Sequence, residues 1–375
     1  MTARVLFHVN HLWGVGHFAR IAAIANALVE AGGAATVLAG NAVPPGRLDA
    51  RVKLVELPVI RAADPAYARL VDAAGAPVSA GLCAGRARLI DAAFAASAPQ
   101  VLVTETFPFG RRKLAAELLH LAGAAKSQGA KIAASIRDLP TAPADTRRLE
   151  DCAGRLRAHY DAVLIHGDPT IAGLNEIWPG EIPVPARFTG YVTAAIPPAP
   201  EARRGIVVSA GGGGDAAPLL QAALAARRAG LLAAESWVFV TGPAAPASLR
   251  TALSDAAPPG CAVLGAVADL PARISRARLA ISRGGYNTVI ETLAAGTPLV
   301  VVPFAPPGEP EQAARAQHFA ATGLLHAVDE AALDAPSLAA ACERALSAPP
   351  PDPARLDFGG AARSAALLAE LAAGG

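Results

Sequence analysis

Short apolar runs alternate with longer, alanine-rich stretches along the whole chain. Runs of this length are typical of strands buried in parallel sheets, and the stretches between them favour helices. Strands are predicted at residues 5–9, 35–39, 52–55, 101–104, 131–135 and 162–165, and again at 205–209, 237–240, 262–264, 279–281 and 299–302. Helices are predicted at 18–31, 114–125 and 361–373, among others. The alternation indicates an α/β fold.

The series of strands restarts after the proline-rich stretch 194–200, and 375 residues are more than one ordinary core accommodates. We therefore expect two Rossmann-like doubly wound domains facing a central cleft, residues 1–193 and 194–357. The final helical stretch, 358–375, is expected to pack back on the first domain. In such sheets ligands bind outside the carboxyl ends of the strands, so candidate site residues are sought there.

The segment from Ser282 to Glu291 reads as a strand end, a glycine turn and the start of a helix. Its candidate residues are Arg283, Gly284, Gly285, Asn287, Thr288 and Glu291. Paired glycines let the backbone approach a ligand, and the helix N-terminus attracts phosphate. Glu291 shares a helix face with Asn287 and Thr288, where its carboxylate would accept hydrogen bonds from ribose hydroxyls. The pattern predicts a nucleotide diphosphate site; the alternative is an ordinary turn followed by a solvated glutamate.

Gly14, Gly16 and His17 form a glycine turn between the first strand and the first helix. An imidazole at a helix N-terminus is kept neutral by the helix dipole, which predicts that His17 is a general base. The alternative is a capping or packed histidine. Glu105, after the strand at 101–104, is a second candidate base, with a salt-bridged contact between domains as its alternative.

Two more loops of the second domain follow strands. The run that contains Ser209, Gly211, Gly212 and Gly213 can wrap a diphosphate with its backbone N–H groups, or it is simply a flexible loop. Glu311 and Gln312 stand in the first turn of a later helix, where they would contact sugar hydroxyls while Arg315 counters a charge. Ordinary capping is the alternative for these three residues.

The composition argues against several classes of function. Lys and Arg number 33 and Asp and Glu 31, without a dense basic run, so no nucleic-acid partner is expected. The four cysteines lack metal-site spacing, and no metal is expected. The N-terminus becomes polar too soon for a signal peptide, and no apolar stretch reaches membrane-spanning length. The expected location is the cytoplasm, with peripheral contact with the inner membrane face as a further option.

Taken together, these motifs resemble those of GT-B glycosyltransferases of family 28, related to the lipid-linked N-acetylglucosaminyltransferase of peptidoglycan synthesis. The motifs that carry the resemblance are Gly14 to His17, the glycines at 211–214, Ser282 to Glu291, residues 295–298, and Glu311 with Gln312. A group of uncharacterised bacterial predicted glycosyltransferases is more similar still. It shares Glu105, residues 107–112, 137–138 and 166–169.

The resemblance implies that the second domain binds a UDP-sugar as co-substrate, without another cofactor. Glu291 would hold the ribose, and the turn at Gly284 and Gly285 would face the diphosphate. Glu311 and Gln312 would touch the donor sugar. The loop that ends at Val267 would meet uracil through backbone groups. The implied reaction is direct displacement with inversion, without a bound metal.

The sequence therefore predicts a metal-independent inverting glycosyltransferase that moves a sugar from a UDP-sugar to an acceptor hydroxyl. Cell-envelope, polysaccharide or secondary-metabolite glycosylation is the expected setting, and the acceptor is lipid-linked or a small molecule. His17, or failing that Glu105, is the expected base. One alternative is a nucleotide-sugar hydrolase in which His17 activates water, since a similar glycine–histidine loop occurs in such an enzyme. Another is a protein that binds nucleotide sugars without turnover.

Overall fold

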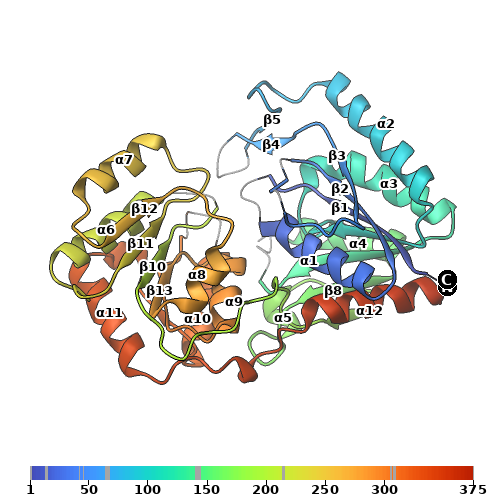
Figure 1. Ribbon diagram of the computed structural model, residues 1–375. Helices are drawn as coiled ribbons and strands as arrows, with labels where there is room; N and C mark the ends of the chain where they lie inside the picture. Colours follow the sequence, from blue (N-terminus) through green and yellow to red (C-terminus); the bar gives the residue numbers. More distant parts are fainter. Residues whose placement is uncertain are drawn as a thin grey trace. The chain divides into compact units, whose positions relative to one another are not determined.

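The computed structural model describes residues 2–12, 16–41, 43–44, 46–63, 68–139, 145–212, 216–304, 306 and 310–374. The chain divides into two compact units (Figure 1). The first unit consists of Met1–Thr193 and Asp357–Gly375, and the second of Ala194–Leu356. Within the described ranges, no helix combines the length and the apolar character that crossing a membrane requires.

Parallel strands form the main sheet of the first unit, in the order β3-β2-β1-β6-β7-β8-β9. The strands are β1 (Arg4–Val9), β2 (Ala34–Ala39), β3 (Lys53–Glu56), β6 (Val101–Glu105), β7 (Lys131–Arg137), β8 (Ala162–His166) and β9 (Ala186–Phe188). Strands β6 and β8 are buried at every position, which is why they appear in the sequence as continuous apolar runs. A small antiparallel pair, β4 (Arg61–Ala62) and β5 (Leu70–Val71), lies outside this sheet.

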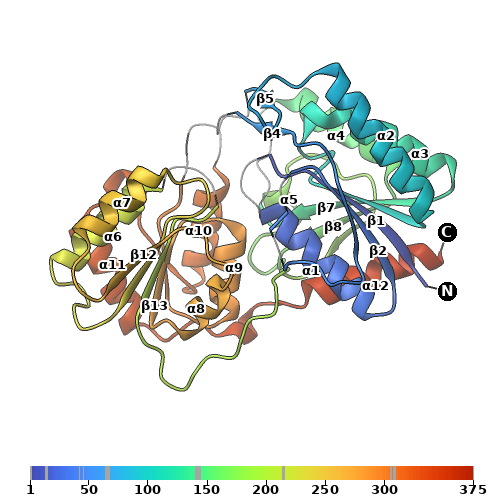
Figure 2. The same cartoon turned by 45° about the horizontal axis from the view of Figure 1, so that its top comes forward.

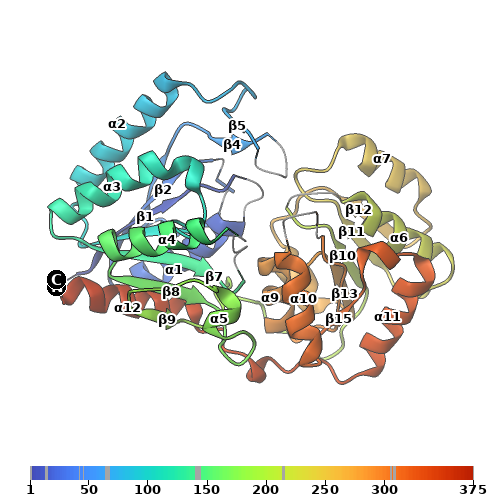
Figure 3. The ribbon, with the colours of Figure 1, turned by 180° about the vertical axis from the view of Figure 1, so that it is seen from behind.

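Helices cover both faces of this sheet (Figures 1 and 3). One face carries α1 (Gly16–Glu30) and α12 (Gly360–Ala373), and the other carries α2 (Ala80–Ser97), α3 (Ala115–Ser127) and α4 (Thr146–His159). The short helices are η1 (Arg112–Leu114) and α5 (Leu174–Ile177). Helix α12, the end of the chain, packs along α1 through Ala365, Leu368 and Ala372. These side chains share one apolar core with the first strands of the chain.

The second unit has a parallel sheet in the order β12-β11-β10-β13-β14-β15. Its strands are β10 (Ile206–Ser209), β11 (Trp237–Val240), β12 (Cys261–Leu264), β13 (Leu279–Ser282), β14 (Leu299–Val301) and β15 (His326–Ala327). Figure 2 shows α6 (Ala217–Arg228), α7 (Ala247–Ala256) and α11 (Ala335–Ser347) on one side of the sheet, and α8 (Leu270–Arg276) and α9 (Tyr286–Ala294) on the other. The remaining helices are α10 (Glu311–Ala321), η2 (Glu330–Ala332) and η3 (Pro353–Arg355).

The register of the strands decides which loops meet in this second unit. Ser209 pairs with Val240 and Ser282, and Ser282 pairs with Val301, so four parallel strands end at one level. The loops that follow them therefore leave from the same edge of the sheet. Two doubly wound parallel sheets confirm the fold class predicted from the sequence.

Candidate active site

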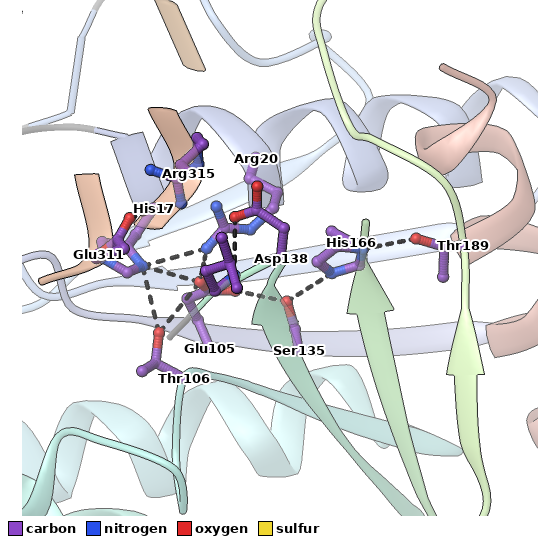
Figure 4. A network of polar contacts seen from close by, with 11 residues as sticks. His17, Arg20, Glu105, Thr106, Ser135, Asp138, His166, Thr189, Glu311 and Arg315 are labelled. Atoms are coloured by element: carbon purple, nitrogen blue, oxygen red, sulfur yellow. Dashed lines mark hydrogen bonds and ion pairs between the residues drawn. The ribbon is translucent and has the colours of Figure 1, made fainter. Parts of the chain in front are cut away.

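A histidine–carboxylate pair stands at the carboxyl edge of the first unit (Figure 4). His17 is the second residue of α1, Glu105 is the last residue of β6, and His17 Nδ1 lies 2.9 Å from Glu105 Oε1. Since an ionised carboxylate can only accept, Nδ1 carries the hydrogen and Nε2 is left as an acceptor. Arg20 Nη2 lies 3.2 Å from the same Nδ1, and because both nitrogens then carry hydrogen, this contact is no hydrogen bond. The pair has the chemistry of a general base held by its carboxylate partner.

The pKa of His17 lies well below that of a free histidine. Burial is the largest cause, the positive charges of Arg111 and Arg137 add to it, and Glu105 opposes it. The side chain is 11% exposed, enough to face a substrate. The sequence predicted a neutral imidazole through the helix dipole, whereas the structure assigns the shift to burial and to two arginines.

The environment of Glu105 suits a partner of His17 better than a second base. Burial alone would raise the pKa of Glu105, but Arg20, whose Nη2 contacts Oε1, outweighs it together with His17 and Ser135. The pKa of Glu105 therefore lies far below its usual range, which makes the carboxylate a very weak proton acceptor. The sequence left His17 and Glu105 as alternatives, and the structure brings them together.

Further polar side chains continue from Glu105 into the protein (Figure 4). Ser135 Oγ lies 2.5 Å from Glu105 Oε2 and 2.9 Å from His166 Nε2, and His166 Nδ1 lies 2.8 Å from Thr189 Oγ1. Sequence reasoning did not single out Ser135 or Thr189. The signal was present in part, since polar residues stand near the carboxyl ends of successive buried strands in this sheet.

The two glycines of the 282–291 segment have different environments. A Cβ added at Gly284 would lie 2.9 Å from the carbonyl oxygen of Gln312, whereas one at Gly285 would meet open space. Gly284 is therefore required by close packing against α10. Gly285 is the N-cap of α9 and makes no side-chain capping bond, so the start of this helix has room for a ligand.

Glu291 and its helix neighbours lie on α9 beyond this turn. Asn287 and Thr288 are half-buried in the first turn, and Glu291 follows one turn later with an exposed fraction of 8%. The spacing matches the shared helix face expected from the sequence.

Arg315 ties α10 to the glycine turn. Its guanidinium is fully buried, donates to Glu311 Oε1 at 2.7 Å and to the Gly284 carbonyl at 2.8 Å, and lies over the ring of Tyr286. Gln312 accepts a hydrogen bond from the Phe304 N–H through Oε1 at 3.1 Å. These contacts give Arg315 and Glu311 a structural part in shaping the site.

Arg283 is also held within the protein. Its guanidinium is 4% exposed, lies 2.6 Å from Glu330 Oε1 and stands over the ring of Phe304. This environment favours a role in fixing the turn over direct contact with a ligand.

The glycine loop after β10 is defined in part. Ser209 is buried and accepts a hydrogen bond from the Gly211 N–H at 3.4 Å, while Gly211 has a φ of +78° that favours glycine. Gly212 is half-buried, as are Gly16 in the first unit and Val267 between β12 and α8. The two remaining predicted glycines, Gly14 and Gly213, lie outside the described residues.

Comparison with known proteins links the second unit to one family. Residues 206–355 match the glycosyltransferase family 28 C-terminal domain. Over 81 residues the chain is 37% identical to the UDP-N-acetylglucosamine–N-acetylmuramyl-(pentapeptide) pyrophosphoryl-undecaprenol N-acetylglucosamine transferase of Sinorhizobium fredii. That match covers 22% of this chain and 22% of the relative, so the chain spans about a fifth of the length of this curated relative.

Solved structures extend the likeness of fold to nearly the whole chain. MurG of Acinetobacter baumannii matches with a TM-score of 0.58 at 15% identity, covering 98% of this chain and 99% of that one. The calicheamicin glycosyltransferase CalG4 matches with a TM-score of 0.59 at 16% identity, covering 99% and 94%. The chain therefore has the GT-B glycosyltransferase fold, and its second unit carries the C-terminal domain of glycosyltransferase family 28.

Proposed function

We propose that the protein is an inverting glycosyltransferase that moves a sugar from a UDP-sugar to an acceptor hydroxyl. The observation that carries the proposal is the family 28 C-terminal domain at residues 206–355, because the curated relative named above is a UDP-N-acetylglucosamine transferase. The histidine–carboxylate pair of the first unit supports it from the side of the acceptor.

On the donor side, the N-terminus of α9 would receive the diphosphate above Gly285, where the structure leaves open space. Glu291 would accept hydrogen bonds from the ribose hydroxyls. As UDP departs it gains negative charge, and the backbone N–H groups and dipole at the start of α9 would stabilise that charge. The Arg315–Glu311 pair would keep the turn in place.

On the acceptor side, His17 Nε2 would take the proton of the attacking hydroxyl. The oxygen then bonds to the anomeric carbon while the bond from that carbon to the UDP oxygen breaks on the opposite face, which inverts the configuration. Glu105 would hold the imidazole and stabilise the imidazolium that forms. No step in this scheme calls for a metal or another cofactor.

The acceptor we propose is a hydroxyl of a lipid-linked or small molecule, in cell-envelope, polysaccharide or secondary-metabolite glycosylation. The lipid-linked option follows the undecaprenol-linked acceptor in the name of the curated relative. We place the reaction in the cytoplasm, with peripheral contact with the membrane when the acceptor is lipid-linked.

Donor binding is tested first. Thermal unfolding with UDP-, GDP- and dTDP-sugars identifies the donor, because a ligand that binds the folded state raises the transition temperature. Calorimetry should then show that Glu291→Ala makes the free energy of UDP binding less favourable by ~1.5–3 kcal/mol, the contribution of a hydrogen bond to a charged group. Glu343→Ala, an exposed carboxylate of α11, is the matched control. Unchanged UDP affinity in Glu291→Ala would refute the ribose assignment.

Turnover is tested with the donor so identified. UDP release in the presence of candidate acceptors should fall by about 10²–10⁴-fold in His17→Ala, the usual worth of a general base. His120→Ala, a 54% exposed histidine on α3, should keep the wild-type rate. UDP release that needs no acceptor would make the protein a hydrolase. Donor binding without turnover on any acceptor would show that the protein binds nucleotide sugars without reacting them.

A further inference from the structure

We propose that Ser135, His166 and Thr189 are positioning residues that hold Glu105 behind His17 and thereby select the tautomer of His17 that can act as a base. This inference rests on the role of His17 proposed above. The three residues belong to β7, to β8 and to the segment after β9, and all are fully buried, so they act without touching a substrate.

The contacts form one unbroken chain across neighbouring strands (Figure 4). His17 Nδ1 meets Glu105 Oε1 at 2.9 Å, and the other carboxylate oxygen meets Ser135 Oγ at 2.5 Å. Ser135 Oγ meets His166 Nε2 at 2.9 Å, and His166 Nδ1 meets Thr189 Oγ1 at 2.8 Å. Arg20 also contacts Oε1, so both oxygens of Glu105 have partners, and these partners together fix the rotation of the carboxylate.

The direction of every hydrogen bond follows from the ionised state of Glu105. Because the carboxylate only accepts, the single proton of Ser135 goes to Oε2, and Ser135 must accept from His166 Nε2–H. Burial lowers the pKa of His166 to about 3, so this ring is neutral and its Nδ1 is bare. The Thr189 hydroxyl, which also lies 2.9 Å from the Gly190 carbonyl oxygen, must then give its one hydrogen to Nδ1. If the Ser135 hydrogen pointed to His166 instead, Ser135 Oγ and Glu105 Oε2 would lie 2.5 Å apart with no hydrogen between them. The geometry thus predicts an Nδ1–H tautomer for His17 and an Nε2–H tautomer for His166.

The C-terminal segment fixes the far end of the chain of contacts. Arg363 Nη1 donates to the Thr189 carbonyl at 2.9 Å, and the Tyr191 N–H donates to the Asp357 carbonyl at 2.7 Å. The two backbones run so close that a Cβ on Gly360 would lie 2.5 Å from the carbonyl oxygen of Gly190. The return of the chain to the first unit therefore holds Thr189 in place.

Loss of Ser135 would free one oxygen of Glu105. The carboxylate would then be held through Oε1 alone, by Arg20 and His17, and could rotate about that contact, so that the Nδ1–H of His17 would lose its fixed acceptor. The Nε2–H tautomer, which has no lone pair at Nε2 for an acceptor hydroxyl, would become populated. Ser135 would thus control the basicity of His17 from two contacts away.

Long-range 1H–15N spectra of the histidine rings in the full-length protein test this directly. In the wild type at pH 7, we expect the Nδ1–H form of His17 and the Nε2–H form of His166. In Ser135→Ala, we expect a mixture of His17 tautomers and a changed His17 pKa on titration, while Ser135→Thr keeps the wild-type signals. With a donor and acceptor in hand, kcat of Ser135→Ala should fall about 10–100-fold, by analogy with the residues that orient metal-binding histidines, with unchanged UDP affinity.

Tyr160→Phe is the matched control, because it removes a buried hydrogen bond of 2.9 Å to Thr104 in the same sheet but outside the chain of contacts. His17 signals in Ser135→Ala that equal those of Tyr160→Phe would overturn the proposal. An Nδ1–H tautomer of His166 in the wild type would overturn it as well, and this outcome does not depend on any variant folding. If the tautomers are as expected but His17→Ala turns over as the wild type, the proposed role of His17 as the base fails and the positioning of Glu105 stands.

Discussion

At the scale of single residues, two buried carboxylates of the candidate sites each contact a buried arginine. Glu105 is 3% exposed and meets Arg20, and Glu311 is 8% exposed and meets Arg315. An unpaired ion in such surroundings costs several kcal/mol, so each pair holds its members in fixed positions. His17 and His166, which lie near Glu105, differ from these ions, because burial keeps both rings neutral. A neutral imidazole in the folded state makes the stability of the first unit depend on pH.

His166 gives this dependence a definite sign. Its pKa is about 3 in the folded protein and close to 6.5 in the unfolded chain, so between these values only the unfolded state binds the proton. The free energy of unfolding should therefore fall as the pH falls from 6.5 towards 3, by ~1.4 kcal/mol per pH unit for this one group. His17 acts in the same direction.

Urea unfolding of the wild type and His166→Gln at pH 6, 5 and 4 measures the effect. The variant will be less stable throughout, but its free energy of unfolding should depend less on pH because this proton is no longer taken up. His120→Gln, at a 54% exposed site, should keep the wild-type slope. Equal slopes for the wild type and His166→Gln would contradict the assignment.

At the scale of elements, burial decides what the sequence could predict. Strands such as β6 and β8 are buried on both faces, so their apolar runs were sufficient to locate them. Short strands carry no such pattern: β4, β5 and β15 have two residues each and β9 has three. They form because neighbouring loops bring them together, which no local pattern predicts.

In the candidate sites, too, the sequence predicts local patterns but not contacts between distant residues. The glycine turn before α9 and the histidine of α1 are local patterns and could be read from the sequence. The Glu105–His17 contact joins residues 88 positions apart, and the Ser135–His166 contact joins residues 31 apart. Such pairings depend on strand order, and alternative orders were equally compatible with the apolar pattern.

The two glycines of the turn before α9 allow a sharp test of that element. Gly284→Ala should lower the free energy of unfolding by ~1–3 kcal/mol, because its Cβ would press on the backbone of α10. Gly285→Ala should leave stability near the wild-type value, since its φ of −66° suits alanine and the site is open.

UDP titration completes this comparison. Gly285→Ala should bind UDP more weakly than the wild type, because the added methyl group occupies the space proposed for the diphosphate. Stability is measured by thermal unfolding and affinity by calorimetry on the same samples. A Gly285→Ala protein with wild-type UDP affinity would show that the diphosphate does not lie over this turn.

At the scale of the whole molecule, each unit has apolar core residues of its own, and the last helix belongs to the core of the first unit. Leu368 of α12 and Leu338 of α11 are both 0% exposed, one in each core. Proteins with two cores commonly unfold in more than one step. A leucine-to-alanine change in either core costs ~2–5 kcal/mol, since it loses buried apolar surface and leaves a cavity.

Calorimetric unfolding should therefore show that Leu368→Ala and Leu338→Ala lower the temperatures of two different unfolding transitions. Bound UDP identifies the transition of the second unit, because a ligand stabilises the unit that binds it. We expect Leu338→Ala to lower the transition that UDP raises, and Leu368→Ala to lower the other one while UDP affinity is kept. If Leu368→Ala instead lowers the UDP-dependent transition, the C-terminal helix supports the nucleotide-binding unit, and the division of the chain at residues 356 and 357 is wrong.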